Sequence, residues 1–395
     1  MLTLSGRGTI GLPSGKDHGR AVVRVVVTDD EVRAPTDARL VRSDPIPPGY
    51  AYYMAHPRDA ALLDGAPSGA ARLVLPDKFD YLAHGDVLCI WTDSGNVRTL
   101  HRRASRHNSF LVTERCNSYC LMCSQPPRNV DDDWIIDEIL EALPLLDPAT
   151  PEIGFTGGEP TLLGERFIGV LRECKRLLPS ASVHVLSNGR KFADPKLARA
   201  WAEVDHPDLM VGIPIYSDIS DRHDYVVQAD GAFDETIRGI LNLKRARQRV
   251  EIRVVIHKQT YTGLPRLAEF LARNLLFVDH VALMGLEIMG FTRANLDLLW
   301  IDPLEYQREL KQAVRTLAGY NMNVSIYNHQ LCLLDRDLWP YAVQSISDWK
   351  NEYIPECAQC SVRERCGGFF SSAQYRRSTN IKAFTTDIPA SAFVR

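Results

Sequence analysis

The chain contains 395 residues, of which 45% are hydrophobic and 24% are charged, and its formal net charge is −3 at pH 7. This length suggests two or three domains of about 100–200 residues each, and the composition excludes a chain that is mainly disordered. The balanced charge disfavours nucleic-acid binding, and without a long apolar run or a signal-peptide pattern we expect a cytoplasmic protein with no membrane span.

The first part of the chain is expected to be a β-rich domain. Ala21–Val27 and Val87–Trp91 are apolar and β-branched, as is typical of strands, and stretches rich in turn residues separate them. Helical periodicity is weak throughout this region, so the sequence assigns no particular fold to it.

The middle of the chain alternates between predicted strands and helices. The expected strands are Ser109–Thr113, Glu152–Phe155, Ser182–Leu186, Leu209–Ile215, Glu251–Ile256 and His280–Met284. In the helix after the second strand, Phe167, Leu171, Cys174 and Leu178 form one apolar face. The aspartates at 131–133 are expected to cap the helix after the first strand. Six βα units in series predict a partial TIM-like (β/α)6 barrel with its functional loops at the carboxyl ends of the strands.

The last part of the chain is expected to be a small separate module. A helix at Pro303–Leu317 and a strand at Asn323–Tyr327 precede a polar and irregular stretch that carries several cysteines. A segment with so few periodic apolar residues usually needs a metal or another staple in order to fold. We therefore predict three domains, at residues 1–105, 106–320 and 321–395.

Nine cysteines are present, and three of them form one short motif. Cys116, Cys120 and Cys123 follow the first barrel strand with the spacing C-x3-C-x2-C. Three thiolates on one loop can hold three irons of a [4Fe-4S] cluster and leave the fourth iron open, whereas a structural zinc needs four ligands. The motif therefore favours an iron–sulfur site over zinc. Cys89 and Cys174 are expected to be core residues.

The C-x3-C-x2-C motif after the first strand resembles the signature of the radical S-adenosylmethionine (SAM) superfamily, with Met122 where the family often has an aromatic residue. The resemblance implies that the open iron binds SAM, and that an external reductant such as flavodoxin or ferredoxin drives formation of a 5′-deoxyadenosyl radical. That radical would then abstract a hydrogen atom. The SAM-contacting positions implied by the resemblance are Gly157, Gly158, Glu159, Ser187, Asn188, Ser217 and Leu286.

A second cysteine motif lies near the C-terminus. Cys357, Cys360 and Cys366 have the spacing C-x2-C-x5-C, and Cys332 precedes them by 25 residues. Four thiolates can fully ligate either a [4Fe-4S] cluster or a zinc ion. The spacing resembles the SPASM and twitch auxiliary-cluster modules of radical SAM enzymes, and the number of cysteines fits the shorter twitch-like type better. An auxiliary [4Fe-4S] cluster is favoured, zinc stays open, and Cys332 could instead be a buried thiol.

The sequences TGGEPTLL, YNHQLC and CAQCSVRERCGGFF together resemble the HxsC-type radical SAM maturases of the His-Xaa-Ser peptide system. This resemblance implies a ribosomal precursor peptide as substrate, a companion radical SAM protein, HxsB, and a small protein, HxsD. Oxidative closure of a crosslink or ring is the preferred outcome. The alternatives are a radical SAM enzyme that modifies another protein or a small molecule, as sulfatase-maturing relatives do, and a non-catalytic scaffold subunit that carries zinc or a cluster.

Overall fold

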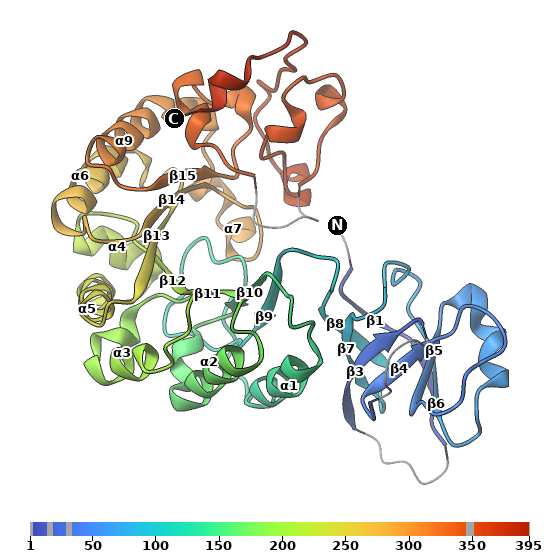
Figure 1. Cartoon of the computed structure of the whole chain (residues 1–395). Coiled ribbons are helices and arrows are strands. Elements are labelled where there is room, and N and C mark those ends of the chain that lie inside the picture. Colours follow the sequence, from blue (N-terminus) through green and yellow to red (C-terminus); the bar gives the residue numbers. More distant parts are fainter. Residues whose placement is uncertain (1–2, 14–18, 29–33, 345–350, 395) are drawn as a thin grey trace. The chain divides into compact units, whose positions relative to one another are not determined.

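The structure is a computed structural model that describes residues 3–13, 19–28, 34–344 and 351–394 (Figure 1). Its contacts divide the chain into two compact units. The first contains residues 1–110, 133–154 and 170–182, and the second contains residues 111–132, 155–169 and 183–395. No helix among the described residues is long and apolar enough to cross a membrane.

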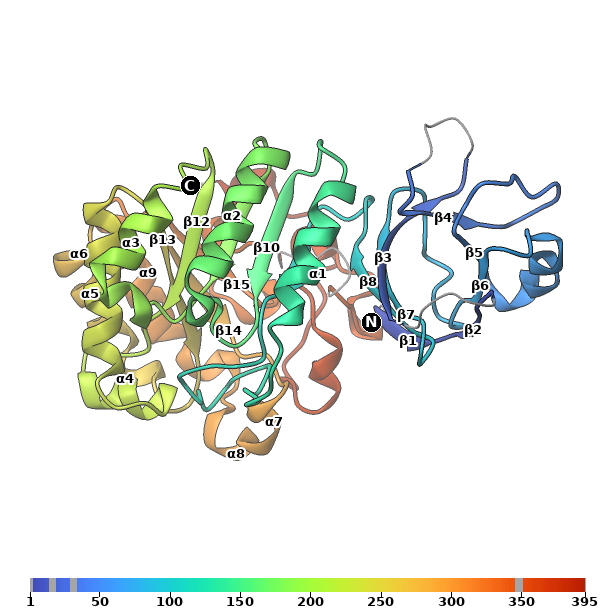
Figure 2. The same ribbon diagram turned by 90° about the horizontal axis from the view of Figure 1, so that it is seen from below.

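The first unit contains a curled eight-stranded sheet. Its strands are β1 (Ser5–Arg7), β2 (Thr9–Gly11), β3 (Arg20–Val26), β4 (Asp37–Leu40), β5 (Tyr52–Ala55), β6 (Ala71–Val74), β7 (Val87–Trp91) and β8 (Asn96–His101). The strand order is β1-β8-β7-β3-β4-β5-β6-β2, and the sheet curls into a ring in Figure 2. One face of the sheet carries a fully buried core that includes Val25, Leu40, Met54 and Leu88. The two predicted strands in this region are confirmed to within one residue.

Helix α1 (Trp134–Ala142) belongs to the same unit as this sheet. The Arg98 guanidinium carbon lies 5.5 Å from the centre of the Trp91 ring and 5.8 Å from that of Trp134, a distance at which cation–π attraction operates. The same guanidinium pairs with Glu138, a carboxylate that is only 1% exposed. The buried charge is therefore compensated by a cation that stacks between two aromatic rings, and this arrangement fixes α1.

The second sheet has seven strands in consecutive order, from β9 at one edge to β15 at the other. The strands are β9 (Asn108–Leu111), β10 (Glu152–Thr156), β11 (Ser182–Leu186), β12 (Leu209–Pro214), β13 (Arg249–Ile256), β14 (His280–Gly285) and β15 (Val324–Tyr327). The pairs from β11 through β15 are parallel. An α/β fold with a parallel sheet is therefore confirmed, and a seventh strand extends the six that the sequence predicted.

Helices cover the outer side of this sheet (Figures 1 and 2). They are α2 (Glu165–Leu177), α3 (Pro195–Ala202), α4 (Ser220–Val227), α5 (Ala232–Arg245), α6 (Leu264–Asn274) and α9 (Gln307–Gly319). The short helices α7 (Phe291–Ala294) and α8 (Leu296–Leu299) lie instead beyond the strand ends in Figure 2. The predicted apolar face of α2 is confirmed, because each of its four residues is at most 1% exposed. These helices bury the Val- and Ile-rich side of each strand, as in other parallel sheets.

The opposite side of strands β13 to β15 carries a polar network. Glu251 accepts hydrogen bonds from Arg253 at 2.6 Å and from His280 at 2.7 Å, and His280 is bonded to the Ser325 hydroxyl at 3.0 Å. Burial opposes ionisation of Glu251, but the hydrogen bond from His280 and the charge of Arg253 outweigh burial and lower its pKa to about 2. This network therefore keeps a buried negative charge on the inner face of the sheet.

One local prediction needs correction, and one strand joins a sheet that the sequence did not assign to it. The aspartates 131–133 do not cap α1, because its N-cap residue Asp133 is helical and makes no capping hydrogen bond through its side chain. The C-terminal strand β15 pairs with β14, so the seven-stranded sheet includes a strand from the region 321–395. Beyond β15 the described chain consists mainly of short 3-10 turns. The domain limits predicted at 105 and 320 remain predictions.

Candidate functional site

The first cysteine motif forms a loop between β9 and α1 whose main chain is tied to α4. The amide of Tyr119 donates to the carbonyl of Val227 at 3.0 Å, and that of Leu121 donates to Val226 at 2.9 Å. Backbone hydrogen bonds of this kind fix the path of a loop independently of its side chains. The three cysteines of the loop are therefore carried on a defined main chain.

The start of the same loop is anchored by Asp132. Its carboxylate accepts hydrogen bonds from the Thr113 hydroxyl at 2.9 Å, from the Arg115 guanidinium at 3.0 Å and from the amide of Glu114. The side chain is 2% exposed, so these donors replace its lost hydration. The aspartate that was expected to cap α1 thus acts instead on the chain segment that leads into the cysteine motif.

The three thiols lie within electrostatic range of one another. Burial, together with the charges of the neighbouring Cys123 and Cys116, raises the pKa of Cys120 to about 12. Burial and the nearby Glu159 carboxylate raise the pKa of Cys116 to about 11. Mutual repulsion of this kind disappears when a metal centre takes the thiolates, and binding then releases protons. The donor set therefore fits a group that bridges three thiolates.

The loop after β10 is packed too closely for side chains at its two glycines. A Cβ on Gly157 would lie 2.5 Å from the carbonyl oxygen of Thr113, and φ of Gly157 is 145°. A Cβ on Gly158 would clash with the Arg115 carbonyl. The amides of Gly158 and Glu159 donate to these two carbonyls at 2.7 and 2.8 Å. Both glycines therefore let this loop lie directly against the segment before the first cysteine.

Glu159 is fully buried and organises the loops after β10 and β11. One carboxylate oxygen accepts from the Thr161 amide and hydroxyl and from the Ser187 hydroxyl, the latter at 2.8 Å. The other oxygen accepts from the Asn188 amide at 2.6 Å. Burial raises the pKa of Glu159, and these four donors act in the opposite direction. The side chain is 0% exposed, and its four donors tie the loop after β10 to the loop after β11, so Glu159 positions these two loops.

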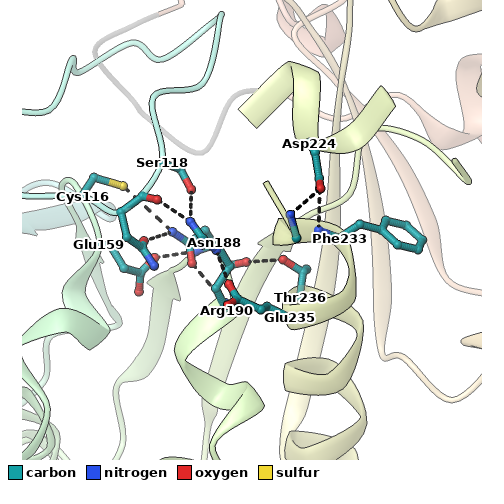
Figure 3. Close-up of polar contacts among 12 residues, drawn as sticks. Cys116, Ser118, Glu159, Asn188, Arg190, Asp224, Phe233, Glu235 and Thr236 are labelled. Atoms are coloured by element: carbon teal, nitrogen blue, oxygen red, sulfur yellow. Dashed lines mark hydrogen bonds and ion pairs between the residues drawn. The ribbon is translucent and has the colours of Figure 1, made fainter. Parts of the chain in front are cut away.

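Asn188 and Arg190 connect the loop after β11 to the first cysteine motif (Figure 3). The side-chain Nδ2 of Asn188 donates to Oδ1 of Asn117 at 2.6 Å and lies 4.0 Å from the Cys116 sulfur. Arg190 donates to the Asn117 carbonyl and to the Ser118 hydroxyl, while its Nε donates to Glu235 at 2.6 Å. We call residues 157–159 the GGE motif and residues 187–189 the SNG motif. The structure thus brings these two motifs and the first cysteine motif together at one edge of the sheet.

Two of the predicted SAM-contacting residues lie apart from this network. Ser217 is buried, and its hydroxyl accepts from the Ile219 amide at 3.1 Å, which makes it a local turn residue before α4. Leu286 follows β14 and packs with Met122, Tyr216 and Cys120 in one apolar cluster. Leu286 is therefore next to the cysteine loop, whereas the hydrogen bond of the Ser217 side chain is local to the turn before α4.

Helices α7 and α8 support the cysteine loop from a different direction. The Thr292 hydroxyl donates to the Met122 carbonyl at 3.0 Å, Nδ2 of Asn295 donates to the Leu121 carbonyl at 2.9 Å, and the Phe291 amide donates to the Cys123 carbonyl at 2.8 Å. Three consecutive carbonyls of the motif are thereby satisfied by one short segment.

The C-terminal segment holds α7 and α8 in turn. The Arg293 guanidinium lies 4.3 Å from the ring centre of Tyr375, and that of Arg376 lies 4.3 Å from the ring centre of Trp300. Arg376 also pairs with Asp297 at 3.1 Å. These two cation–π contacts and the ion pair hold the segment after the last cysteine against α7 and α8. We call this set of three contacts the clasp.

The four cysteines of the second motif also interact with one another. Burial raises the pKa of Cys332, and the Cys357 and Cys360 thiols raise it further. Burial raises the pKa of Cys366, with added effects of Cys332 and Cys357. The Cys366 sulfur accepts hydrogen bonds from the amides of Leu331 and Gly368 at 3.4 and 3.5 Å.

Amide hydrogen bonds to sulfur stabilise thiolates and tune iron–sulfur centres. The second set of cysteines therefore fits a thiolate-bound metal centre. Within the described ranges, no group of three or more His, Cys, Asp or Glu side chains has the arrangement that would hold a single metal ion.

Comparison with known proteins identifies the site. The sequence model of the Radical SAM superfamily matches residues 110–271, which include the first cysteine motif and both loops that contact it. Residues 110–271 are therefore similar to the radical SAM domain. The superfamily resemblance that the motif predicted is thereby confirmed, and a [4Fe-4S] cluster and SAM are the cofactors that this family implies.

The relatives of this chain cover only parts of it. The Fe-coproporphyrin III synthase of Methanosarcina barkeri (strain Fusaro / DSM 804) is 26% identical over 171 residues, or 40% of this chain and 39% of that protein. SuiB of Streptococcus suis bound to S-adenosylmethionine is 16% identical, with a TM-score of 0.44 over 58% of this chain and 51% of SuiB. Native anSMEcpe with bound AdoMet is 15% identical, with a TM-score of 0.48 over 70% of this chain and 92% of that chain. The chain therefore spans about two fifths of the curated relative and about half of SuiB.

Several residues that shape the radical SAM site were missed by sequence reasoning. They are Asn117, Asp132, Arg190, Thr292 and Asn295. Each is a common polar residue without a motif of its own, and each acts through a partner far away in the sequence. The Asp-rich stretch before α1 was the one available signal, and it was assigned to helix capping.

Proposed function

We propose that the protein is a radical SAM enzyme that modifies a ribosomal precursor peptide. The observation that carries the proposal is the junction of the three-cysteine loop with the GGE and SNG loops, through Glu159, Asn188 and Asn117. When bound, a reduced [4Fe-4S] cluster with SAM supplies a 5′-deoxyadenosyl radical that removes one hydrogen atom from a substrate. Cys116, Cys120 and Cys123 would hold that cluster.

The protein's own contribution is positioning. Glu159 and the glycines before it hold the loop after β10 against the cysteine segment, and Arg190 fixes the carbonyl of Asn117. Helices α7 and α8 fix three carbonyls of the cysteine loop. These contacts all pair groups of the chain with one another, so they hold the cysteine loop and the two loops beside it in one arrangement.

The substrate assignment depends on the sequence around the motifs, which resembles the HxsC-type maturases of His-Xaa-Ser peptide systems, with HxsB and HxsD as the implied partners. The clustering of four C-terminal thiols supports it, since an auxiliary iron–sulfur cluster at Cys332, Cys357, Cys360 and Cys366 suits an oxidative modification. Closure of a crosslink or ring removes two hydrogens from the peptide, one as the abstracted atom and the other as a proton and an electron.

Anaerobic reconstitution tests the enzyme. We expect about eight irons per chain if both thiol sets bind [4Fe-4S] clusters, and reductant-dependent cleavage of SAM into methionine and 5′-deoxyadenosine. Replacing Cys116, Cys120 and Cys123 by alanine should remove about half of the iron and should abolish SAM cleavage. Cys174→Ala is the matched control, because this thiol is buried on α2 away from both motifs.

Co-expression with a His-Xaa-Ser precursor and mass spectrometry of the peptide test the substrate. The expected product is lighter than the precursor by two hydrogens. Zinc in place of iron at the C-terminal cysteines, together with no cleavage of SAM, would support a scaffold subunit instead. Active SAM cleavage with an unchanged peptide would point to another protein or a small molecule.

A further inference from the structure

A pocket lies between the ends of β14 and β15 and the chain segment that follows the last cysteine. Residues 285–288 form one wall, residues 300–306 form a second, and residues 367–378 form the third. Its cavity volume is about 80 Å³, several times the roughly 10–15 Å³ that one water molecule needs. None of the predicted SAM-contacting residues except Leu286 lines it.

The walls of the pocket carry polar and apolar surface in similar amounts. The apolar part comes from Leu286 and Ile288 in the loop after β14, from Trp300 at the end of α8, and from Phe369 and Phe370 in the C-terminal segment. Aliphatic and aromatic side chains of this kind favour an apolar group, because its transfer out of water contributes about 25 cal/mol per Å² of buried area. One part of the pocket can therefore take an apolar side chain, and the rest of its surface is polar.

The charges that line the pocket have one sign. Its lining residues include Arg376 and Arg377 and neither aspartate nor glutamate. Arg376 is already committed to Asp297 and to the Trp300 ring. Within the described part of the chain, Arg377 forms no hydrogen bond or ion pair and is exposed.

A second donor lies in the same wall. Ser372 is 6% exposed, and its hydroxyl has no hydrogen-bond partner among the described residues. A guanidinium and a hydroxyl beside these apolar side chains complement a group that accepts hydrogen bonds, and a carboxylate is the strongest partner for a guanidinium.

We propose that this pocket binds a peptide segment in which an apolar or aromatic side chain lies next to a carboxylate, with the carboxylate on Arg377 and Ser372. The carboxylate could belong to an acidic side chain or to the C-terminus of the peptide, since both present the same chemistry. The peptide assignment rests on the proposed function, but the pocket and its charge do not.

Binding of small probes to the full reconstituted chain tests the pocket without any turnover. Three acetylated probes that carry 4-fluorophenylalanine are compared by ¹⁹F NMR: the free acid, the amide, and the amide extended by one glutamate. We expect at least one carboxylate-bearing probe to bind at least tenfold more tightly than the plain amide. Tight binding of the free acid alone would indicate a C-terminal carboxylate, and tight binding of the glutamate probe would indicate an acidic side chain.

Variants assign the binding to this pocket. Arg377→Gln should weaken the carboxylate-bearing probe about tenfold and leave the plain amide unchanged, and Ser372→Ala should weaken it less. Arg238→Gln, an exposed position on α5, is the control and should have no effect. Equal affinity for acid and amide, or an unchanged affinity in Arg377→Gln, would overturn the proposal. Competitive displacement of the probe by SAM would also overturn it, because the pocket would then belong to the cofactor.

A failure of the proposed function has a different signature. If SAM is not cleaved but the probes bind as expected, the pocket stands and the enzyme assignment does not. If SAM is cleaved but no probe binds, only the pocket proposal is wrong.

Discussion

Replacing Glu159 by glutamine tests whether the two acceptor oxygens of its carboxylate, rather than the size of its side chain, position the site. The substitution keeps the size of the side chain but puts an NH2 group on one end. The Thr161 amide donates to Oε1 at 3.0 Å and the Asn188 amide donates to Oε2 at 2.6 Å, so each end of the carboxylate faces a main-chain N–H. Whichever way the new amide turns, its NH2 must face a donor, and one buried backbone N–H loses its partner.

The cost of one buried unsatisfied donor is about 1–3 kcal/mol. We therefore expect Glu159→Gln to lower the free energy of unfolding by about that amount, measured by chemical denaturation of the chain without cofactors. Iron retained after anaerobic gel filtration should also fall, because Asn188 holds Asn117 next to Cys116. Glu173→Gln is the control, since this exposed residue pairs only with Arg176 on the helix surface. If both variants unfold at the same denaturant concentration and retain the same iron, Glu159 does not organise the site.

Three further predictions concern other parts of the chain. Arg376→Gln should change the free energy of unfolding by at most about 1 kcal/mol, but should speed amide hydrogen exchange in residues 291–300. The control, Arg315→Gln at an exposed position, should leave that exchange unchanged. Equal exchange rates in the two variants would contradict the clasp. Burial lowers the pKa of His257 to about 4, so the unfolded chain takes up a proton between pH 6.5 and 4 that the folded chain does not, and stability falls as pH drops through this window. His257→Asn keeps the acceptor for the Gln259 amide and should flatten the dependence of Tm on pH there; an unchanged slope would refute this assignment. The pKa of Glu251 is held at about 2, so its contribution, on the order of 2–3 kcal/mol, is present above pH 4.5 and lost as pH falls toward 2; acid titration of Glu251→Gln should lack this loss.

Individual strands in both sheets could be predicted because their signal is local. Runs such as Ser182–Leu186 and Val87–Trp91 are short, apolar and bounded by turn residues, and the structure reproduces both without change. The ring of the first unit could not be predicted, because its strand order depends on pairings such as Ser5 with Arg98 and Thr9 with Val74. Three-residue strands carry too little pattern to reveal partners that are more than 60 residues away in the sequence.

The residues of the candidate site also divide into those that the sequence predicts and those that it does not. The cysteines and glycines carry their chemistry in their spacing, so they were found from the sequence. The role of Asp132 was misassigned because an aspartate before a helix is more often a cap, and only tertiary contacts show that it turns back to Thr113. Arg190 looks like a surface residue in the sequence, yet its side chain is 13% exposed and holds the cysteine loop.

The two cysteine motifs depend on one short support. Residues 291–295 satisfy three carbonyls of the first motif, and residues 293–300 receive the clasp from Tyr375 and Arg376, which follow the second motif by about ten residues. Residues 291–300 therefore contact both the first cysteine loop and the segment that follows the last cysteine. Trp300 is part of both this clasp and the wall of the proposed peptide pocket. A ligand that packs on Trp300 would thus bind to the same support that holds the SAM-site carbonyls, which gives substrate binding a direct physical route to the chemistry.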